Sequence, residues 1–176
     1  MNFSPTPLAG VMVIELEPHK DERGFFARSF CREEFAAHDL EPAVAQCNVS
    51  YSPRKLTMRG MHYQAKPYAE AKLVRCTRGA VYDVVIDLRR DSSTFKRYFA
   101  IELSWQNHTM LYVPKGFAHG FLTLEPESEV FYQMSVAYQG ESARGVRWND
   151  PVFAIPWPHE PEVISERDAS FPGFSV

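Results

Sequence analysis

Residues that could transfer protons stand in two separate segments of this chain. The first is His62-Tyr63-Gln64, followed by Lys72, and the second is Pro114-Lys115-Gly116-Phe117-Ala118-His119. Removing a proton from a carbon next to a carbonyl needs a base that titrates near neutral pH, and histidine is such a base. A lysine can stabilise the enolate oxygen, and a tyrosine on the other face can return the proton. The residue types therefore favour epimerisation or isomerisation.

The spacing of the two segments resembles that of cupin barrels, which hold a metal with two His and a Glu from the first segment and a His from the second. Here Gln64 replaces the second histidine, and Lys72 most naturally takes the Glu position. The metal ions that such sites hold prefer imidazole and carboxylate ligands, and an ammonium group would repel them. The sequence predicts no metal and no other cofactor, and a metal-dependent cupin such as a dioxygenase is a less favoured alternative.

The composition is typical of a globular protein rich in β-structure. The chain has 176 residues, a net charge of −3, 45% hydrophobic and 14% aromatic residues, and 13 prolines against 9 glycines. This length predicts a single domain over residues 1–176. The weakly acidic, scattered charge disfavours nucleic acid or a membrane surface as a partner. Without a signal segment, an apolar span or a disulfide pattern among Cys31, Cys47 and Cys76, we expect a soluble, cytoplasmic protein.

Most segments alternate apolar and polar residues, which is the period of half-buried strands. Eight or more such strands predict an all-β fold with a few short helices, either a sandwich or a closed barrel. One helix is expected over residues 32–38, and the proline-rich residues 151–176 are expected to wrap the surface. The predicted strands cover residues 11–16, 25–30, 71–77, 80–88, 98–103, 110–113, 120–124 and 129–136.

In a strand, alternate residues share a face, so the candidate site residues can be grouped with their neighbours. Each group mixes apolar and polar residues, as the lumen of a barrel with a polar pocket would. Taken alone, Lys72 would more often be a solvated surface residue and His62 a buried core histidine. The predicted faces are Met58, Gly60, His62 and Gln64; Lys72, Val74 and Cys76; and Tyr132, Met134, Val136 and Tyr138.

Short blocks of sequence identify the chain more specifically through their order and spacing. They are residues 21–26, 48–52, 59–64, 72–76, 83–89, 114–121, 132, 138, 148–151, 157–158 and 165–168. Together these blocks resemble the dTDP-4-dehydrorhamnose 3,5-epimerase family of nucleotide-sugar epimerases over nearly the whole chain.

The resemblance implies an all-β, antiparallel jelly-roll (cupin) barrel with a few short helices, which forms a metal-free homodimer. The enzyme would epimerise a nucleotide-linked 4-keto-6-deoxyhexose at C3, C5 or both, most directly dTDP-4-dehydro-6-deoxyglucose to dTDP-4-dehydrorhamnose. It implies His62 as the general base and Asp168 as the carboxylate that orients it. Lys72 would stabilise the enolate, and Tyr132 would return the proton from the opposite face. The substrate-binding residues that it implies are Arg23, Phe26, Arg28, Gln46, Asn48, Arg59, Gln64, His119 and Tyr138.

The same resemblance implies a dimer formed through the N-terminal strands, with Phe25 and Phe26 partly in the interface. The product would feed dTDP-rhamnose and polysaccharide biosynthesis, such as that of O-antigen, or a glycosylated secondary metabolite. Three departures fall where the nucleotide should bind. Arg28 stands where the family has Glu, Cys47 replaces an Asp, and residues 18–21 form a shorter stretch than usual.

The departures leave the nucleotide open among dTDP, CDP and GDP. The alternatives are a 3-epimerase without C5 activity, a 3,4-ketoisomerase and a non-catalytic sugar-binding cupin. Retention of Tyr132 and Asp168 disfavours the ketoisomerase. The intact set of base, acid and lysine disfavours a protein that only binds sugar, because binding needs no acid and base on opposite faces.

Overall fold

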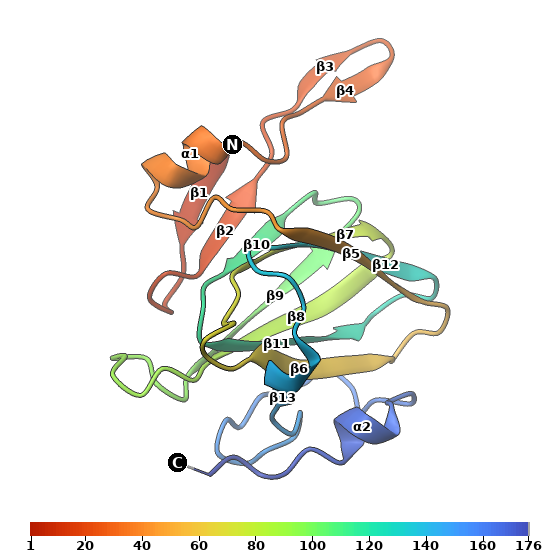
Figure 1. The fold of residues 1–176 in the computed structure, drawn as a ribbon. Coiled ribbons are helices and arrows are strands. Elements are labelled where there is room, and N and C mark those ends of the chain that lie inside the picture. Colours follow the sequence, from red (N-terminus) through yellow and green to blue (C-terminus); the bar gives the residue numbers. More distant parts are fainter. Residues whose placement is uncertain (176) are drawn as a thin grey trace.

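The computed structural model describes residues 1–175 and consists mainly of antiparallel strands (Figure 1). In chain order the elements are β1 (Asn2–Pro5), β2 (Met12–Glu15), β3 (His19–Asp21), β4 (Gly24–Phe26), α1 (Arg32–Ala37), β5 (Gln46–Ser52), β6 (Met58–Gln64), β7 (Lys72–Arg78), β8 (Ala80–Asp87), β9 (Tyr98–Ser104), β10 (Met110–Val113), β11 (Phe117–Thr123), β12 (Ser128–Met134), the 3₁₀-helix η1 (Gly140–Ser142), β13 (Ala143–Gly145) and α2 (Glu166–Ala169).

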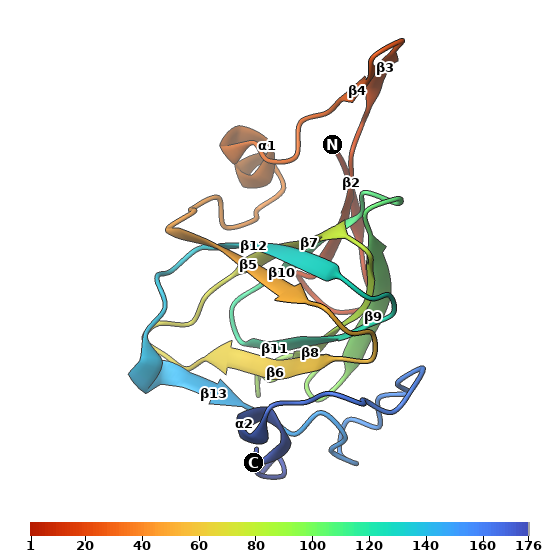
Figure 2. The same ribbon diagram turned by 90° about the vertical axis from the view of Figure 1, so that its right-hand side faces the viewer.

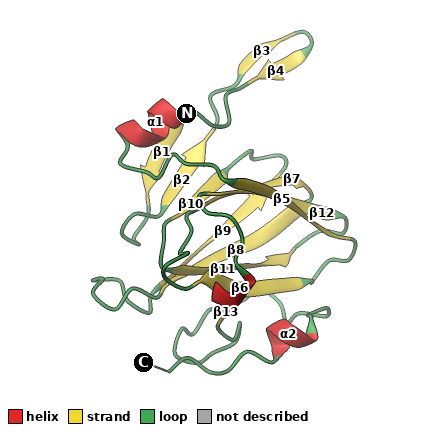
Figure 3. Ribbon diagram, viewed as in Figure 1, coloured by secondary structure: helices red, strands yellow, loops and turns green. Residues whose placement is uncertain are grey.

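Two sheets face each other and form the body of the molecule. The first has the strand order β1-β2-β10-β7-β12-β5, and the second has the order β13-β6-β11-β8-β9. Helices are confined to the margins of this sandwich (Figure 3). The predicted antiparallel jelly-roll fold with a few short helices is therefore confirmed.

Most predicted elements occur close to their predicted positions, and the differences have local causes. The strand predicted over residues 25–30 is wrong beyond Phe26, because β4 pairs only with the short β3 and belongs to neither large sheet. β12 ends at Met134 rather than at Val136. β5 was not predicted, although its residues alternate between polar and apolar side chains.

Apolar side chains from both sheets meet between them and make the main core. Val74 and Val130 come from the first sheet, and Val85 and Phe121 come from the second. Burial of such side chains contributes about 1.5–3 kcal/mol each to folding. The inward faces predicted for β7 and β12 supply Val74, Cys76 and Tyr132 to this cluster, as the two-residue period requires.

Each sheet is also covered on part of its outer face. Helix α1 lies over one half of the first sheet, where Phe35 packs with Ile14, Leu73 and Met110. The C-terminal segment crosses the second sheet, where Phe153 packs with apolar residues of β6, β8 and β11 (Figure 2). The prediction that the proline-rich end wraps the surface is confirmed for the part of it that the structure describes.

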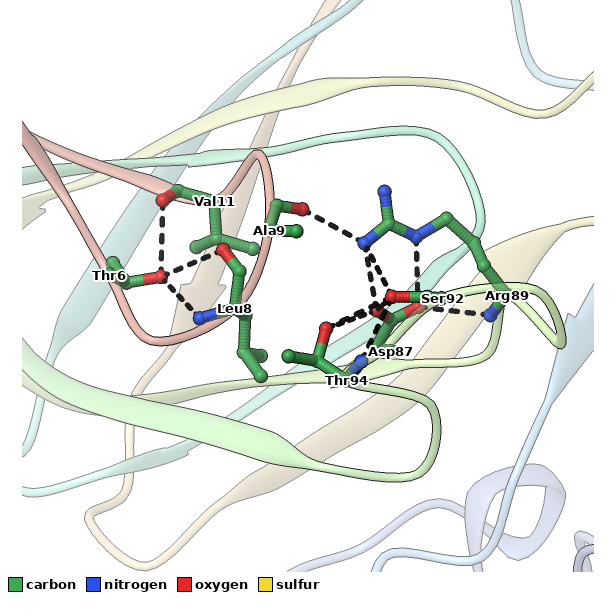
Figure 4. Close-up of polar contacts among 8 residues, drawn as sticks. All are labelled: Thr6, Leu8, Ala9, Val11, Asp87, Arg89, Ser92 and Thr94. Carbon is green, nitrogen blue, oxygen red and sulfur yellow. Dashed lines mark hydrogen bonds and ion pairs between the residues drawn. The ribbon is translucent and has the colours of Figure 1, made fainter.

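A buried carboxylate fastens the loop between β8 and β9 to the N-terminal loop. Asp87 accepts hydrogen bonds from the Arg89 guanidinium and from the hydroxyls of Ser92 and Thr94 (Figure 4). Arg89 also donates to the carbonyl oxygen of Ala9 at 2.8 Å. Burial raises the pKa of Asp87, but these hydrogen bonds outweigh it and bring the pKa to about 2.

Hairpin β3–β4 projects away from the sandwich (Figures 1 and 2). Phe26 is 76% exposed and Phe25 is 48% exposed, although the Phe25 ring contacts His108 with a centroid distance of 4.9 Å. The two strands of this hairpin are joined by a tight two-residue connection between Asp21 and Gly24. Among the described residues, no helix has the length and apolar character needed to cross a membrane.

Candidate active site

A cavity of about 380 Å³ opens between the two sheets beside the main core. One wall comes from β5, β7 and β12 of the first sheet, and the other comes from β6 and β11 of the second. Most of the residues predicted for the site from β5 to β12 are brought together here. Its lining is Asn48, Val49, Ser50, Tyr51, Arg59, His62, Lys72, His119, Gly120, Phe121, Tyr132 and Met134.

A bulge in β6 sets which of its residues face this cavity. Two residues of β6, Gly60 and Met61, oppose the single Gly120 of β11, because His62 pairs with His119 while Arg59 pairs with Phe121. The bulge turns Arg59 and His62 to the same side, although they are three residues apart. The predicted grouping of Met58 with His62 on one face is therefore wrong, because strict alternation fails at the bulge.

Only glycine fits at the centre of this bulge. Gly60 has a φ of +136°, and a Cβ there would lie 2.5 Å from the Cα of Gly120. A Cβ on Gly120 would in turn lie 2.7 Å from the carbonyl oxygen of Arg59. The two glycines let β6 and β11 approach closely enough to place His62 opposite His119.

His62 is bonded to a carboxylate that comes from the far end of the chain. Its Nε2 lies 2.7 Å from Oδ1 of Asp168, on helix α2. Oδ2 of Asp168 accepts from the backbone N–H of Gly60 at 3.1 Å, and Ser165 caps the helix by accepting from the Asp168 N–H. Burial raises the pKa of Asp168, but the hydrogen bond with His62 and the charge that its ring carries when protonated, with the two further hydrogen bonds, leave it lowered.

This arrangement gives His62 the geometry of an oriented base. Asp168 stays ionised at neutral pH and fixes the proton of the neutral imidazole on Nε2, so that Nδ1 is the nitrogen that can accept a proton. The side chain of His62 is 41% exposed, whereas that of Asp168 is 7% exposed. The imidazole is thus held from behind and remains accessible from the cavity.

Lys72 enters the cavity from β7 and is held by a buried carboxylate. Its Nζ lies 3.1 Å from Oε1 of Glu70 and donates to the carbonyl oxygen of His62 at 3.2 Å. The side chains of Lys72 and Glu70 are 8% and 2% exposed. The other oxygen of Glu70 accepts from the backbone N–H of Gln64 at 3.1 Å. An ammonium group fixed in this way provides a positive charge beside the imidazole.

Tyr132 reaches the cavity from β12, on the sheet that faces β6. Burial and then the negative charge of Asp83 raise the pKa of its phenol, while the nearby Ser50 hydroxyl and the positive charge of Arg59 oppose them. The net shift is upward, so the phenol is protonated at neutral pH and can act as a proton donor. Base and phenol therefore approach the cavity from opposite sheets.

His119 stands directly opposite His62 on β11. Its Nε2 lies 3.0 and 2.9 Å from the two carboxylate oxygens of Asp83 on β8. Both side chains are buried, at 4% and 0% exposure. The cavity wall thus contains two neighbouring histidines that are each bonded to an aspartate.

A smaller cavity of about 200 Å³ continues the site past His62 and Lys72. Tyr138, which is 56% exposed, and Arg167 line it together with Gln64. The backbone N–H groups of residues 138 and 139 donate to the side chains of Gln46 and Gln64 at 2.9 and 2.6 Å. These two glutamines therefore fix the backbone that carries Tyr138.

Three predicted substrate-binding residues lie away from the cavity on hairpin β3–β4 or just after it. Arg23 pairs with Asp21 of the same hairpin, and Phe26 is exposed. Arg28 forms an ion pair with Glu34 of helix α1, with 2.8 Å between Nη1 and Oε1. None of the three lines either part of the cavity in this chain.

The donor set of the site does not fit a metal ion. Nε2 of each cavity histidine is already bonded to an aspartate, and the ammonium group of Lys72 stands beside His62. Within residues 1–175 no group of three or more His, Cys, Asp and Glu side chains has the arrangement of a metal site. A positive charge at this position would repel a cation rather than bind it.

Comparison with known proteins agrees with this geometry. The model of the dTDP-4-dehydrorhamnose 3,5-epimerase family matches residues 5–175. The chain belongs to this family. A dTDP-4-dehydrorhamnose 3,5-epimerase from Sinorhizobium fredii is 40% identical over 173 residues, which cover 98% of this chain and 89% of that protein. The resemblance inferred from the sequence is confirmed.

Solved structures of related epimerases have the same fold. The dTDP-4-dehydrorhamnose 3,5-epimerase from Bacillus anthracis, with TDP and pyrophosphate bound, superposes with a TM-score of 0.94 at 40% identity, covering 98% of this chain and 99% of that one. A 3′-monoepimerase from Streptomyces bikiniensis in complex with dTDP-quinovose has a TM-score of 0.88 at 32% identity, covering 96% and 86%. Both kinds of sugar epimerase thus share this architecture.

Sequence reasoning missed three polar residues of the site in this member of the epimerase family. Glu70 holds Lys72, Asp83 holds His119, and Arg167 lines the smaller cavity. A carboxylate inside the apolar run of β8 is a detectable signal for Asp83, because such a group needs a buried partner. Glu70 and Arg167 precede Lys72 and Asp168 closely in the sequence, but no pattern there indicates their contacts.

Proposed function

We propose that this chain epimerises a dTDP-linked 4-keto-6-deoxyhexose at C3 and C5, converting dTDP-4-dehydro-6-deoxyglucose to dTDP-4-dehydrorhamnose. The observation that carries the proposal is the pairing of an oriented base, His62, with a protonated phenol, Tyr132, on facing sheets of one cavity. Inversion at a carbon needs a proton to leave from one side and return from the other. Membership of the epimerase family supports the same chemistry.

In the proposed mechanism, Nδ1 of His62 removes the proton from C3 or C5, each of which adjoins the C4 ketone. Asp168 stabilises the imidazolium that forms. The ammonium group of Lys72 stabilises the negative charge that develops on the C4 oxygen. Tyr132 then protonates the enolate carbon from the opposite face. Each step needs only side chains that line the cavity or touch its lining.

The roles of the substrate-binding residues are also proposals. Arg59 and Asn48, which line the larger cavity, would hold the sugar and the diphosphate together with Gln46, which bonds to the backbone N–H of residue 138, and Arg167 adds a guanidinium beside His62. His119 would bond to the sugar through its free ring nitrogen. The side chain of Gln64 is buried, and both its polar atoms bond to the backbone, at Tyr68 and at residue 139, which supports a positioning role.

A homodimer would explain the exposed apolar surface of this chain. Helix α1 covers only one half of the first sheet, and on the other half Val49 is 60% exposed and Tyr51 is 44% exposed. Apolar patches of this kind mark interaction surfaces. A second copy would also bring hairpin β3–β4 to the cavity of its partner, where Arg23, Phe26 and Arg28 could bind the nucleotide.

Mixing two inactive variants tests this dimer. In a mixed dimer of Arg23→Ala and His62→Ala, one site has both an intact base and an intact hairpin if each hairpin serves the partner. We expect activity to return on mixing, and sedimentation to give twice the mass of one chain. No recovery in a demonstrated mixed dimer would contradict a shared site. The predicted cytoplasmic location stays a prediction.

Deuterium wash-in tests the proposed reaction. The protein is incubated in D₂O with 4-keto-6-deoxyglucose linked to dTDP, CDP or GDP, and exchange at C3 and C5 is followed by NMR. We expect exchange and inversion at both carbons of the dTDP sugar. Absence of exchange with all three substrates would refute an epimerase of this class, and preference for CDP or GDP would correct the nucleotide.

A 3-epimerase without C5 activity is the second candidate, because a 3′-monoepimerase is among the structural relatives. The same wash-in experiment separates the two candidates. Exchange confined to C3 would select the monoepimerase, whereas exchange at both carbons selects the 3,5-epimerase.

A further inference from the structure

Burying the pair of Asp83 and His119 costs desolvation free energy, and neither residue has a role in the proton transfers described above. Both side chains are almost completely removed from water, at 0% and 4% exposure. The two oxygens of Asp83 share a single N–H, that of His119 Nε2. Replacing such a pair by apolar residues of similar size is often neutral or stabilising. Its presence therefore calls for a reason other than stability.

Strand pairing does not supply that reason. β8 and β11 are already paired along their whole length, from Phe117 opposite Asp87 to Thr123 opposite Val81. The side chains around the pair, such as those of Val85 and Phe121, are apolar and belong to the main core. The backbone ladder and this core hold the two strands together without an ion pair.

The pair instead stands next to Tyr132, because Asp83 bonds to His119 and the ring of His119 contacts the ring of Tyr132. The ring of His119 lies edge-on to that of Tyr132, with centroids 6.0 Å apart and planes at 79°. The charge of Asp83 is, after burial, the largest influence raising the pKa of the phenol. The other groups around the phenol are Ser50 from β5, Arg59 and His62 from β6, and Lys72 from β7, all of which line the same cavity.

We propose that Asp83 is a positioning residue for the epimerisation, which fixes the Nε2–H tautomer of His119 and ensures that Tyr132 is protonated before each inversion. This inference rests on the proposed function. After Tyr132 gives its proton to the enolate carbon, a phenolate remains, and His62 releases to solvent the proton that it removed. The negative charge of Asp83 makes the phenolate more basic, so that it takes a proton back from water.

The substitution Asp83→Asn separates charge from shape. An asparagine of the same size still offers an oxygen to the His119 N–H, but it carries no charge. The direct measurement is the ultraviolet absorbance of tyrosinate during a pH titration, with Tyr132 isolated by subtracting the matching Tyr132→Phe protein. We expect Tyr132 to titrate at lower pH in Asp83→Asn than in the wild type, by about one unit or more.

A carboxylate on the same strand provides the matched control. Asp87 is also completely buried in β8, but it bonds to Arg89, Ser92 and Thr94 outside the cavity. Asp87→Asn should lower stability and leave the titration of Tyr132 where it is in the wild type. A general loosening of the fold would instead move Tyr132 in both variants, and that result would overturn the proposal.

Activity supplies a second readout. In Asp83→Asn we expect the alkaline limb of the inversion rate to move to lower pH, while deuterium wash-in at neutral pH persists. His119→Gln retains an N–H that can bond to Asp83, and it leaves the negative charge of Asp83 in place. Tyr132 should therefore still titrate at a pH as high as in the wild type, while KM rises. A folded Asp83→Asn protein with wild-type titration and a wild-type pH profile would overturn the inference.

If Asp83→Asn does not fold, His119→Gln alone decides. Titration of Tyr132 at a lower pH than in the wild type would overturn the inference, and titration at the wild-type pH with a raised KM would support it. The titration needs no substrate. If the wild type turned over no 4-keto sugar, the proposed function would fail while the link between Asp83 and Tyr132 could still be measured.

Discussion

Two His–Asp pairs lie side by side in this molecule, and their surroundings give them different capabilities. His62 is 41% exposed and opens to the cavity, whereas His119 is 4% exposed. Asp168 reaches the first pair from helix α2 near the C-terminus, while Asp83 reaches the second from the adjacent strand β8. The same two residue types can therefore provide a base that meets substrate or a fixed group that orients others, and exposure decides which.

The largest expected effect is that of removing the exposed imidazole. His62→Ala should abolish deuterium wash-in at every carbon, because loss of a general base lowers the rate by ~10²–10⁴-fold. His119→Ala should instead raise KM and retain exchange at saturating substrate. Circular dichroism should show both variants folded. Full exchange in His62→Ala would show that the base lies elsewhere.

The next largest effect is expected from Tyr132→Phe, which tests whether the base and the acid act on opposite faces of the sugar. In Tyr132→Phe, His62 can still remove a proton and return it on the same side, so deuterium should wash in with little inversion. NMR of the recovered sugar measures both quantities in one sample. If wash-in and inversion fell together, Tyr132 would be a positioning residue and another group would have to be the acid.

A smaller effect is expected from removing the charge behind His62. Asp168→Asn should lower the exchange rate by on the order of tenfold to a hundredfold, since the amide can orient the ring but cannot stabilise the imidazolium. Because the pKa of Asp168 is lowered in the fold, its carboxylate stabilises the protein at neutral pH, and this contribution is lost as pH falls through that lowered value. A wild-type exchange rate would show that Asp168 only caps the helix.

The smallest effect on activity is expected from a buried aspartate outside both pairs. Asp87 has a pKa of about 2 in the fold against an ordinary value of 3.8, so it contributes about 2 kcal/mol above pH ~4, which is lost as pH falls towards 2. Asp87→Asn should lower the unfolding free energy at pH 7 and flatten its decline in acid, with kcat unchanged. Urea denaturation at several pH values measures this; equal stability of the two proteins would contradict it.

Residue types and local spacing alone determined much of this protein. The two-residue period predicted which residues of β7 and of β12 share a face, Lys72 with Val74 and Tyr132 with Met134, although Lys72 taken alone was expected to face solvent. The order of the sequence blocks indicated the epimerase family, which the comparisons confirm. These features are local or depend on order along the chain, so they can be read without coordinates.

Tertiary structure alone decided the contacts that complete the site. The bulge at Gly60 turned Arg59 to the same side as His62, because two residues of β6 oppose one of β11. Glu70 and Asp83 acquired partners only when strands packed side by side, and no periodicity encodes a cross-strand bond. Hairpin β3–β4 lies away from the cavity of its own chain, because its two strands pair only with each other and join neither large sheet. That distance depends on how the whole chain packs.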